Sequence, residues 1–203
     1  MQQCCFARYC SGEDSYRTDP FAMLFSHRDQ DRHAPLSDAL QCGCSSIEMD
    51  VYYHAGQSCF VLAHDRSRIE SALAEARTLE HSYFDPLWRL YRQNALKHQV
   101  RLYVDLKSGG ADAYELVRCL APYQEMLCTY DNVTGREKNG LVKVVLTGCR
   151  GVWRERLKSS ERPACTPLFV DGRLGDTLTG SIGDLTPLVS SEYKVSFPGQ
   201  WRD

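Results

Sequence analysis

Ionisable side chains stand at or near the carboxyl ends of four successive apolar runs in this 203-residue sequence. In chain order they are His27-Arg28, the Glu48-x-Asp50 pair, His64-Asp65 and the Asp105-x-Lys107 pair. Residues two apart on a β-strand point to the same face, so the members of each spaced pair share a face. The pattern therefore predicts that these polar groups meet at one place.

Three carboxylates gathered in one place indicate a divalent cation site. Burying Glu48, Asp50 and Asp105 together is costly unless a cation balances their charge. Mg²⁺ prefers oxygen ligands and often takes a substrate phosphate as a further ligand, and Ca²⁺ is another oxygen-binding divalent cation. We therefore expect Glu48, Asp50 and Asp105 to be metal ligands.

Two histidines and two cationic side chains accompany the carboxylates. An unperturbed imidazole titrates near about pH 6.5, so His27 and His64 are candidates for general base and general acid. Arg28 and Lys107 are suited to hold the non-bridging oxygens of a phosphate. Any one of these motifs alone is more often structural than functional, and their joint order along the chain is what favours a site.

The elements that must position these residues alternate between strands and helices. Strand-type runs are expected at residues 21–25, 46–52, 59–63, 100–106, 141–146 and 168–170. Helical spacing is expected at residues 35–43, 68–77, 86–96 and 111–120. Such alternation predicts parallel pairing in an α/β architecture, in which functional groups gather at the carboxyl ends of the strands.

Composition excludes several function classes. The chain has 24 Lys and Arg against 26 Asp and Glu, a net charge of -2, which removes the usual reason to expect binding to nucleic acid. No run approaches the roughly 20 apolar residues of a membrane-spanning helix, so no transmembrane segment is expected. The first twenty residues lack the basic start and apolar core of a signal peptide, which favours a cytoplasmic protein with reduced cysteines.

The joint pattern resembles the phospholipase C-like phosphodiesterase superfamily, which includes glycerophosphodiester phosphodiesterases, phosphatidylinositol-specific phospholipases C and sphingomyelinase D toxins. The likeness is greatest to the fungal and bacterial group named for the altered inheritance of mitochondria protein. Besides the polar motifs above, the segments that carry this likeness are Pro35-Leu36-x-x-Ala39-Leu40-x-x-Gly43, Thr78-Leu79-x-x-x-Tyr83-x-Asp85-Pro86-Leu87 and Asp171 to Arg173.

The resemblance implies a TIM-type (β/α) barrel with Mg²⁺ or a similar cation at Glu48, Asp50 and Asp105. It also implies acid and base roles for His27 and His64, and phosphate contacts at Arg28 and Lys107. Arg28 is similar to the glycerophosphodiesterases, whereas the altered inheritance of mitochondria group usually has Asn at this position. The implied reaction is cleavage of a phosphodiester by water, or by a neighbouring substrate hydroxyl that first gives a cyclic phosphate.

The chain is expected to form one barrel domain, residues 21–203, behind a polar leader, residues 1–20. Only five or six core strands can be counted where a closed barrel has about eight, so the barrel is expected to be incomplete at its C-terminus. Open sheet edges of this kind could drive self-association.

Three functions remain open at this point. The first is a metal-dependent phosphoric diester hydrolase of lipid metabolism, acting on a glycerophosphodiester or a lysophospholipid. The second is a catalytically inactive barrel that binds phosphate groups or a partner. The third is a zinc module built on Cys4, Cys5 and Cys10, although no Cys-x-x-Cys pair occurs in the sequence. Neither the head group nor the acyl chain of a substrate can be predicted from these residues.

Overall fold

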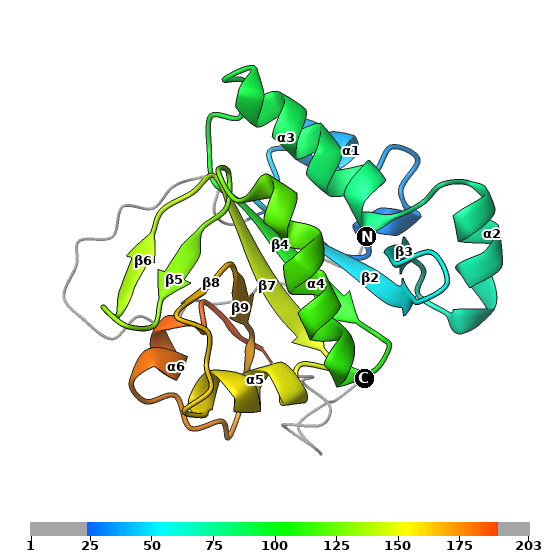
Figure 1. Cartoon of the computed structure of the whole chain (residues 1–203). Helices are drawn as coiled ribbons and strands as arrows, with labels where there is room; N and C mark the ends of the chain where they lie inside the picture. The colour runs from blue at the N-terminus through cyan, green and yellow to red at the C-terminus, as the bar shows by residue number, and fades with distance from the viewer. Residues whose placement is uncertain (1–23, 191–203) are drawn as a thin grey trace, which may run out of the picture.

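The computed structural model describes residues 24–190 (Figure 1). The expected leader, residues 1–20, lies outside the described residues, together with its three cysteines and most of the expected strand 21–25. Residues 191–203 of the expected barrel domain also lie outside them.

A mostly parallel six-stranded sheet forms the centre of the fold, in the order β1-β2-β4-β7-β9, with β3 paired to β2 off this path (Figure 1). All pairs along the main path are parallel. The strands are β1 Phe25–Ser26, β2 Ser46–His54, β3 Cys59–Leu62, β4 Val100–Leu106, β7 Val142–Gly148 and β9 Leu168–Val170. The predicted α/β class with parallel pairing is confirmed.

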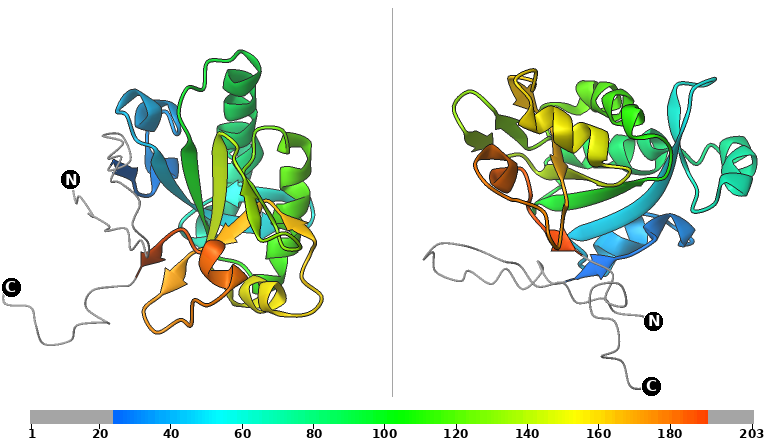
Figure 2. Two further views of the ribbon diagram at one scale, coloured as in Figure 1. Left: turned by 90° about the vertical axis from the view of Figure 1, so that its left-hand side faces the viewer. Right: turned by 90° about the horizontal axis from the view of Figure 1, so that it is seen from below.

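Helices connect the parallel strands, and α3 and α4 lie against one face of the sheet (Figures 1 and 2). The α-helices are α1 Ser37–Gln41, α2 Ile69–Ala74, α3 Asp85–Arg92, α4 Ala113–Leu120, α5 Gly151–Lys158 and α6 Ser181–Asp184. Single turns of 3-10 or π type are η1 Asp29–Asp31, η2 Arg66–Arg68, η3 Glu80–Phe84, η4 Gly110–Asp112 and η5 Ala121–Tyr123.

Two smaller sheets were not predicted from the sequence. One is antiparallel, in the order β6-β5-β8, and consists of β5 Thr129–Asp131, β6 Arg136–Lys138 and β8 Cys165–Thr166. The other is the parallel pair of β10 Gly172–Arg173 and β11 Val189–Ser190. Strand β10 follows β9 directly along the chain, and β11 comes after α6 and brings Ser190 within hydrogen-bond distance of Asp171, just after β9.

The two faces of the central sheet differ in chemistry because successive strand residues point to opposite sides. On β2, Ile47, Met49 and Val51 are fully buried on one face, and the register places Leu102, Val104 and Leu106 of β4 beside them. Full burial of a side chain of this size stabilises the fold by about 1.5–3 kcal/mol. The opposite face of β2 carries Glu48 and Asp50, so the apolar face forms the core and leaves the polar face for the site.

The expected TIM-type barrel is not closed within residues 24–190. In the central sheet, the first and last strands of the path, β1 and β9, each pair with one neighbour only. The physical reason is the number of strands, since five parallel strands are fewer than the roughly eight that close such a barrel. None of the helices in the described part is long and apolar enough to cross a membrane.

Candidate metal and phosphate site

The middle of β2 and the carboxyl end of β4 carry a cluster of three carboxylates. Asp50 on β2 is in register with Asp105 on β4, and Glu48 lies two residues earlier on the same face of β2. One oxygen from each of the three carboxylates lies within 4.8 Å of the others. Asp50 is 2% exposed and Glu48 is 7% exposed, so both charges are removed from water. The structure thus brings together the three residues expected to be metal ligands.

Lys107 lies inside this cluster. Its Nζ is 2.8 Å from Asp50 Oδ1 and 2.7 Å from Asp105 Oδ2. Its backbone N–H donates to the carbonyl oxygen of Val51, which fixes the chain just after β4 against β2. Desolvation opposes the charge of the ammonium group, but the hydrogen bonds and charges of Asp105 and Asp50 outweigh it and raise the pKa of Lys107 above its usual range. The lysine therefore stays protonated.

Arg28 reaches the cluster through both its backbone and its side chain. Its N–H donates to Glu48 Oε2 at 2.7 Å, and its Nε lies 3.9 Å from Asp50 Oδ2. The guanidinium also pairs with Asp31, at 2.8 Å. Arg28 has a φ of 50°, a left-handed conformation that costs a non-glycine residue about 1–2 kcal/mol. The strained residue is therefore the same one whose N–H donates to Glu48.

The η1 turn supports the cluster through two buried residues that sequence reasoning missed. Gln30 clamps Asp50 at two points, since its Nε2 donates to Asp50 Oδ2 at 2.6 Å and its Oε1 accepts from the Asp50 N–H at 3.2 Å. Asp29 accepts hydrogen bonds from the Ser26 hydroxyl, the Leu36 N–H and the Tyr83 hydroxyl, at 2.6–3.0 Å. The sequence gives only a weak indication of the roles of Asp29 and Gln30, because polar residues are common in the loops that follow strands.

The two histidines lie on the same edge of β2, opposite β4. Alternate residues of a strand direct their backbone groups to opposite edges. The Ser46 N–H bonds Leu24 beside β1 and the Asp50 carbonyl accepts from Ala63 just after β3, whereas the Val51 carbonyl bonds Lys107 on the β4 side. Strands β1 and β3, which lead into His27 and His64, therefore both occupy the edge away from β4.

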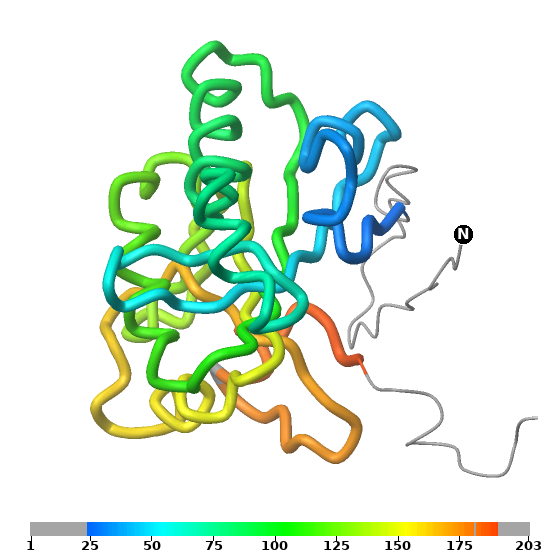
Figure 3. Tube along the Cα trace, turned by 90° about the vertical axis from the view of Figure 1, so that its right-hand side faces the viewer, coloured from blue at the N-terminus to red at the C-terminus, as the bar shows by residue number. Residues whose placement is uncertain are grey.

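Strand β3 pairs with β2 in the antiparallel direction. The alternation of strands and helices along the sequence had predicted parallel pairing. The two strands form a hairpin, traced in cyan in Figure 3, with Val51 in register with Leu62. A hairpin turns the chain back on itself, so the end of β3 returns to the middle of β2. His64 is thereby placed beside the carboxylates rather than at the far tip of the hairpin.

The histidines contact the surrounding acids without being buried. His27 Nε2 lies 3.7 Å from Glu48 Oε2, and the His27 side chain is 60% exposed. His64 Nδ1 lies 3.2 Å from Asp65 Oδ1, and the His64 side chain is 39% exposed. Both rings are open to a ligand arriving at the strand ends.

Burial raises the pKa of Glu48 to about 7. The hydrogen bond from the Arg28 N–H opposes this rise, and the negative charges of Asp50 and Asp105 add to it. Without a cation, Glu48 is thus partly protonated near neutral pH. A bound divalent cation would favour the deprotonated carboxylate.

The donor set fits a hard divalent cation. Asp105 Oδ1 is buried and has no hydrogen-bond partner, a costly state for a carboxylate oxygen that a metal would relieve. Gly148 leaves the room for this oxygen, since a Cβ at that glycine would lie 2.1 Å from Asp105 Oδ1. Gly148 also has a φ of 67°. In the sequence, the only indication of this role was the position of Gly148 at the end of a strand.

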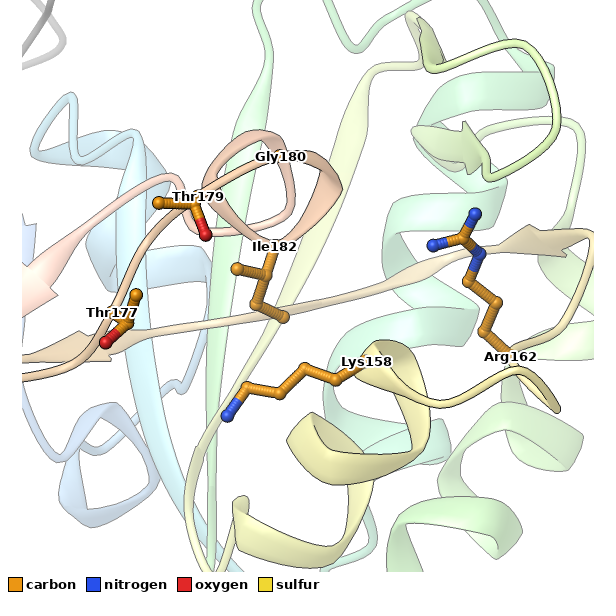
Figure 4. A pocket seen from close by; sticks show the side chains of 6 residues that line it. All are labelled: Lys158, Arg162, Thr177, Thr179, Gly180 and Ile182. Carbon is orange, nitrogen blue, oxygen red and sulfur yellow. The ribbon is translucent and has the colours of Figure 1, made fainter.

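Two hollows are lined by polar residues of the described part. One, of about 220 Å³, is lined by His64 together with polar residues that include Asp31, Arg68 and Arg77. The other, of about 490 Å³, is lined by Lys158, Arg162, Thr177, Thr179, Gly180 and Ile182 (Figure 4). The second hollow involves none of the site residues expected from the sequence.

Residues 16–100 match the AIM6-like phosphodiesterase domain family. The chain is 29% identical over 147 residues to the Altered inheritance of mitochondria protein 6 of Eremothecium gossypii, covering 62% of this chain and 36% of that protein. It is 27% identical over 198 residues to the Altered inheritance of mitochondria protein 6 homolog of Arthroderma benhamiae, covering 83% and 58%. The chain thus spans less than two thirds of each of these relatives.

No solved structure matches the chain. The family match contains His27, Arg28, Glu48, Asp50 and His64, and ends before Asp105 and Lys107. The matches confirm the likeness to the altered inheritance of mitochondria group that the sequence motifs predicted, and they are consistent with the phosphodiesterase superfamily.

Proposed function

We propose that the chain is a divalent-metal-dependent phosphoric diester hydrolase that acts on a glycerophosphodiester or a lysophospholipid. The observation that carries the proposal is the convergence of Glu48, Asp50 and Asp105, whose oxygens lie within 4.8 Å of one another. The cationic side chains of Arg28 and Lys107 and the accessible imidazoles of His27 and His64 accompany these carboxylates. The likeness of residues 16–100 to a phosphodiesterase domain supports the same reaction class.

Glu48, Asp50 and Asp105 would hold the Mg²⁺ ion. When bound, the ion supplies Lewis-acid stabilisation of the charge that develops on the phosphoryl oxygens. Arg28 and Lys107 hold non-bridging oxygens of the same phosphate by charge-assisted hydrogen bonds. The Gln30 clamp keeps Asp50 in place, so that this carboxylate does not turn away when substrate enters.

The histidines move the protons. One imidazole takes the proton of the attacking hydroxyl, from water or from the substrate, as the new P–O bond forms. The other gives a proton to the leaving oxygen as the old P–O bond breaks. Asp65 lies against Nδ1 of His64, so it orients that ring with Nε2 directed away from Asp65 and available to substrate.

A phosphate-binding protein without turnover is the alternative. The observation that favours it is the open central sheet within the described residues, which leaves the site without the enclosing strands of a complete barrel. In that case the carboxylates would still bind Mg²⁺ and the cations would still bind phosphate. The two functions therefore differ only in turnover.

The test is hydrolysis of bis(p-nitrophenyl) phosphate, glycerophosphocholine and lysophosphatidylcholine by the purified chain, with and without Mg²⁺. The hydrolase predicts Mg²⁺-dependent turnover that falls about 10²–10⁴-fold in His27→Ala and in His64→Ala. His81→Ala, at an exposed position on η3, is the matched control and should match the wild type. Mg²⁺ binding by a folded wild-type chain without turnover on any of the three substrates would favour the binding protein.

A further inference from the structure

A second polar cluster stands beside the carboxylates, at the ends of β7 and β9. Thr147 on β7 is in register with Asp105 on β4. The Asp171 N–H donates to the Leu146 carbonyl at 3.0 Å, which continues the β7–β9 pairing by one residue and sets Asp171 beside Thr147. Asp105, Thr147 and Asp171 therefore form one row across three neighbouring strands.

Asp171 is 2% exposed and organises this cluster. Its Oδ2 accepts from the Thr147 hydroxyl at 3.0 Å and from the Ser190 hydroxyl at 3.2 Å, and it pairs with Arg173 Nη1. Its Oδ1 lies 3.0 Å from Arg150 Nε but has no partner in hydrogen-bond geometry. One carboxylate thus serves two guanidinium groups.

The terminal nitrogens of the Arg173 guanidinium are held by neighbouring side chains, and part of the Arg173 side chain is exposed to solvent. Nη2 donates to the Thr147 hydroxyl at 3.1 Å, and Nη1 contacts both Asp171 and the Ser190 hydroxyl. The Arg173 side chain is nevertheless 39% exposed. A guanidinium held in this way is oriented in advance for an anion, since its planar fork loses little further freedom on binding.

The cluster carries more positive than negative charge. Its buried and half-buried members are three guanidinium groups and two carboxylates, namely Arg150, Arg154, Arg173, Asp171 and Asp176. The side chains of Arg150 and Arg154 are 12% and 10% exposed. Arg154 also pairs with the exposed Glu155, at 3.7 Å, and Arg173 is the most exposed of the three guanidinium groups.

We infer that Arg173 is a further phosphate-contacting residue, which approaches an anionic oxygen of the substrate from the β9 side of the carboxylates. This inference rests on the proposed function. Adjacent strands lie about 4.8 Å apart, so the guanidinium beside Thr147 is roughly one to two strand spacings from Asp105. A phosphate group held by a metal at Asp105 would be of a size to fill such a gap. Arg28 and Lys107 approach the same phosphate from the β1 and β4 sides.

The test is calorimetric titration of inorganic phosphate into the full chain at saturating Mg²⁺. Arg173→Gln should weaken phosphate binding roughly 10- to 100-fold, the loss expected for one hydrogen bond between charged groups. Arg173→Lys should lose less, because it keeps the charge without the fork. The matched control is Arg118→Gln, whose arginine is 76% exposed on α4 and pairs with Glu115. It should bind phosphate as the wild type does.

A second measurement on the wild-type chain keeps the inference falsifiable if Arg173→Gln does not fold. Phosphate with Mg²⁺ should slow the modification of Arg173 by phenylglyoxal several-fold, as followed by mass spectrometry, and should leave Arg118 unprotected. Wild-type phosphate affinity in a folded Arg173→Gln variant, absence of phosphate binding by the wild type, or unprotected Arg173 would each overturn the inference.

The two proposals fail separately. Arg173-dependent phosphate binding without turnover would leave the role of Arg173 intact and contradict the hydrolase. Mg²⁺-dependent turnover with phosphate affinity that is insensitive to Arg173 would support the hydrolase and remove Arg173 from it.

Discussion

The two polar clusters at the carboxyl ends of the strands are opposite in charge balance. At β2 and β4, the three carboxylates share Lys107 and Arg28, and Asp105 Oδ1 is left without a hydrogen-bond partner. At β7 and β9, Asp171 and Asp176 pair with three guanidinium groups. The first cluster offers a buried carboxylate oxygen to a cation, and the second offers the partly exposed guanidinium of Arg173 to an anion. A phosphate bound to a metal satisfies both, which is why their adjacency favours phosphodiester chemistry.

The clusters also differ in how they are held. The carboxylates depend on the segment after β1, where the backbone of Arg28 is left-handed and the side chain of Gln30 clamps Asp50. The cluster around Asp171 depends on side-chain hydroxyls, those of Thr147 and Ser190. A change in the backbone near β1 should therefore affect cation binding before it affects the arginine cluster.

Among the changes that test the contrast between the two clusters, the largest expected effect comes from removing one charge from the acidic cluster. Asp50→Asn keeps the size of the side chain but loses a metal ligand and the attraction for Lys107. We expect Mg²⁺-dependent hydrolysis of bis(p-nitrophenyl) phosphate to fall on the order of 10²–10³-fold. The matched control is Glu70→Gln, at an exposed position on α2, which should leave turnover unchanged. Wild-type turnover in Asp50→Asn would remove Asp50 from the catalytic site.

A smaller effect is expected where the strand β7 makes room for Asp105. In Gly148→Ala, the new Cβ would lie 2.1 Å from Asp105 Oδ1 and 2.6 Å from the Leu106 carbonyl oxygen, so the carboxylate must move. We expect Mg²⁺ affinity to fall about tenfold, or roughly 1.4 kcal/mol, by calorimetry. Gly180→Ala is the control, because Gly180 also has a positive φ, of 58°, but has open space around it. Equal Mg²⁺ affinity in the two variants would show that the clash does not matter.

Glu48 predicts a pH dependence of cation binding. Its pKa is raised from 4.5 to about 7, and the proton must leave when the carboxylate binds a metal. Mg²⁺ affinity should therefore rise about tenfold between about pH 6 and pH 8, as measured by calorimetry at both values. Glu48→Gln should abolish this rise. A pH-independent Mg²⁺ affinity in the wild type would contradict a role for Glu48 as a ligand.

The same shift affects stability in the absence of metal. Because the folded state binds this proton more tightly than the unfolded state, the contribution is complete below about pH 4.5 and is lost as the pH rises through about 7. The metal-free wild type should thus lose more unfolding free energy over this range than Glu48→Gln does, as measured by urea denaturation in EDTA. Identical pH profiles would exclude the shift.

The smallest effect is expected at the hollow in Figure 4. Lys158 lines that hollow and pairs with the exposed Glu155, which also pairs with Arg154 at the margin of the second cluster. Lys158→Gln should leave turnover and phosphate affinity within about twofold of the wild type, as expected of a surface ion pair. A large loss of turnover would show that the reaction involves α5 and that the two strand-end clusters do not account for turnover by themselves.

The parts of the fold that the sequence predicted well are those with regular burial. Strands β4 and β9 begin and end at the predicted residues, because their apolar residues belong to a sheet buried between neighbours. The sheet β6-β5-β8 was missed because its strands have only two or three residues and none of them is an apolar run. The turn between β5 and β6 could have been predicted, because Asp131 and Gly135 are residue types that favour turns. In the structure, Asp131 Oδ1 accepts from the N–H groups of Val133 and Thr134, and Gly135 has a positive φ.

The candidate site was predictable where spacing within one strand decides it. Glu48 with Asp50, and Asp105 with Lys107, follow directly from two-residue periodicity. The support of the site was not predictable, because Gln30 meets Asp50 across 20 residues of chain and Gly148 on β7 meets Asp105 on the neighbouring strand β4. Such contacts depend on how the strands are ordered in space, which local spacing does not encode.

The most direct test of the account is calorimetric titration of Mg²⁺ into the wild-type chain and Asp105→Asn, in one buffer near about pH 8, where Glu48 is mostly ionised. The account predicts a single Mg²⁺ site in the wild type and affinity at least about tenfold weaker in the variant, at an unchanged melting temperature. No Mg²⁺ binding by the folded wild type, or equal affinity in the two proteins, would contradict it.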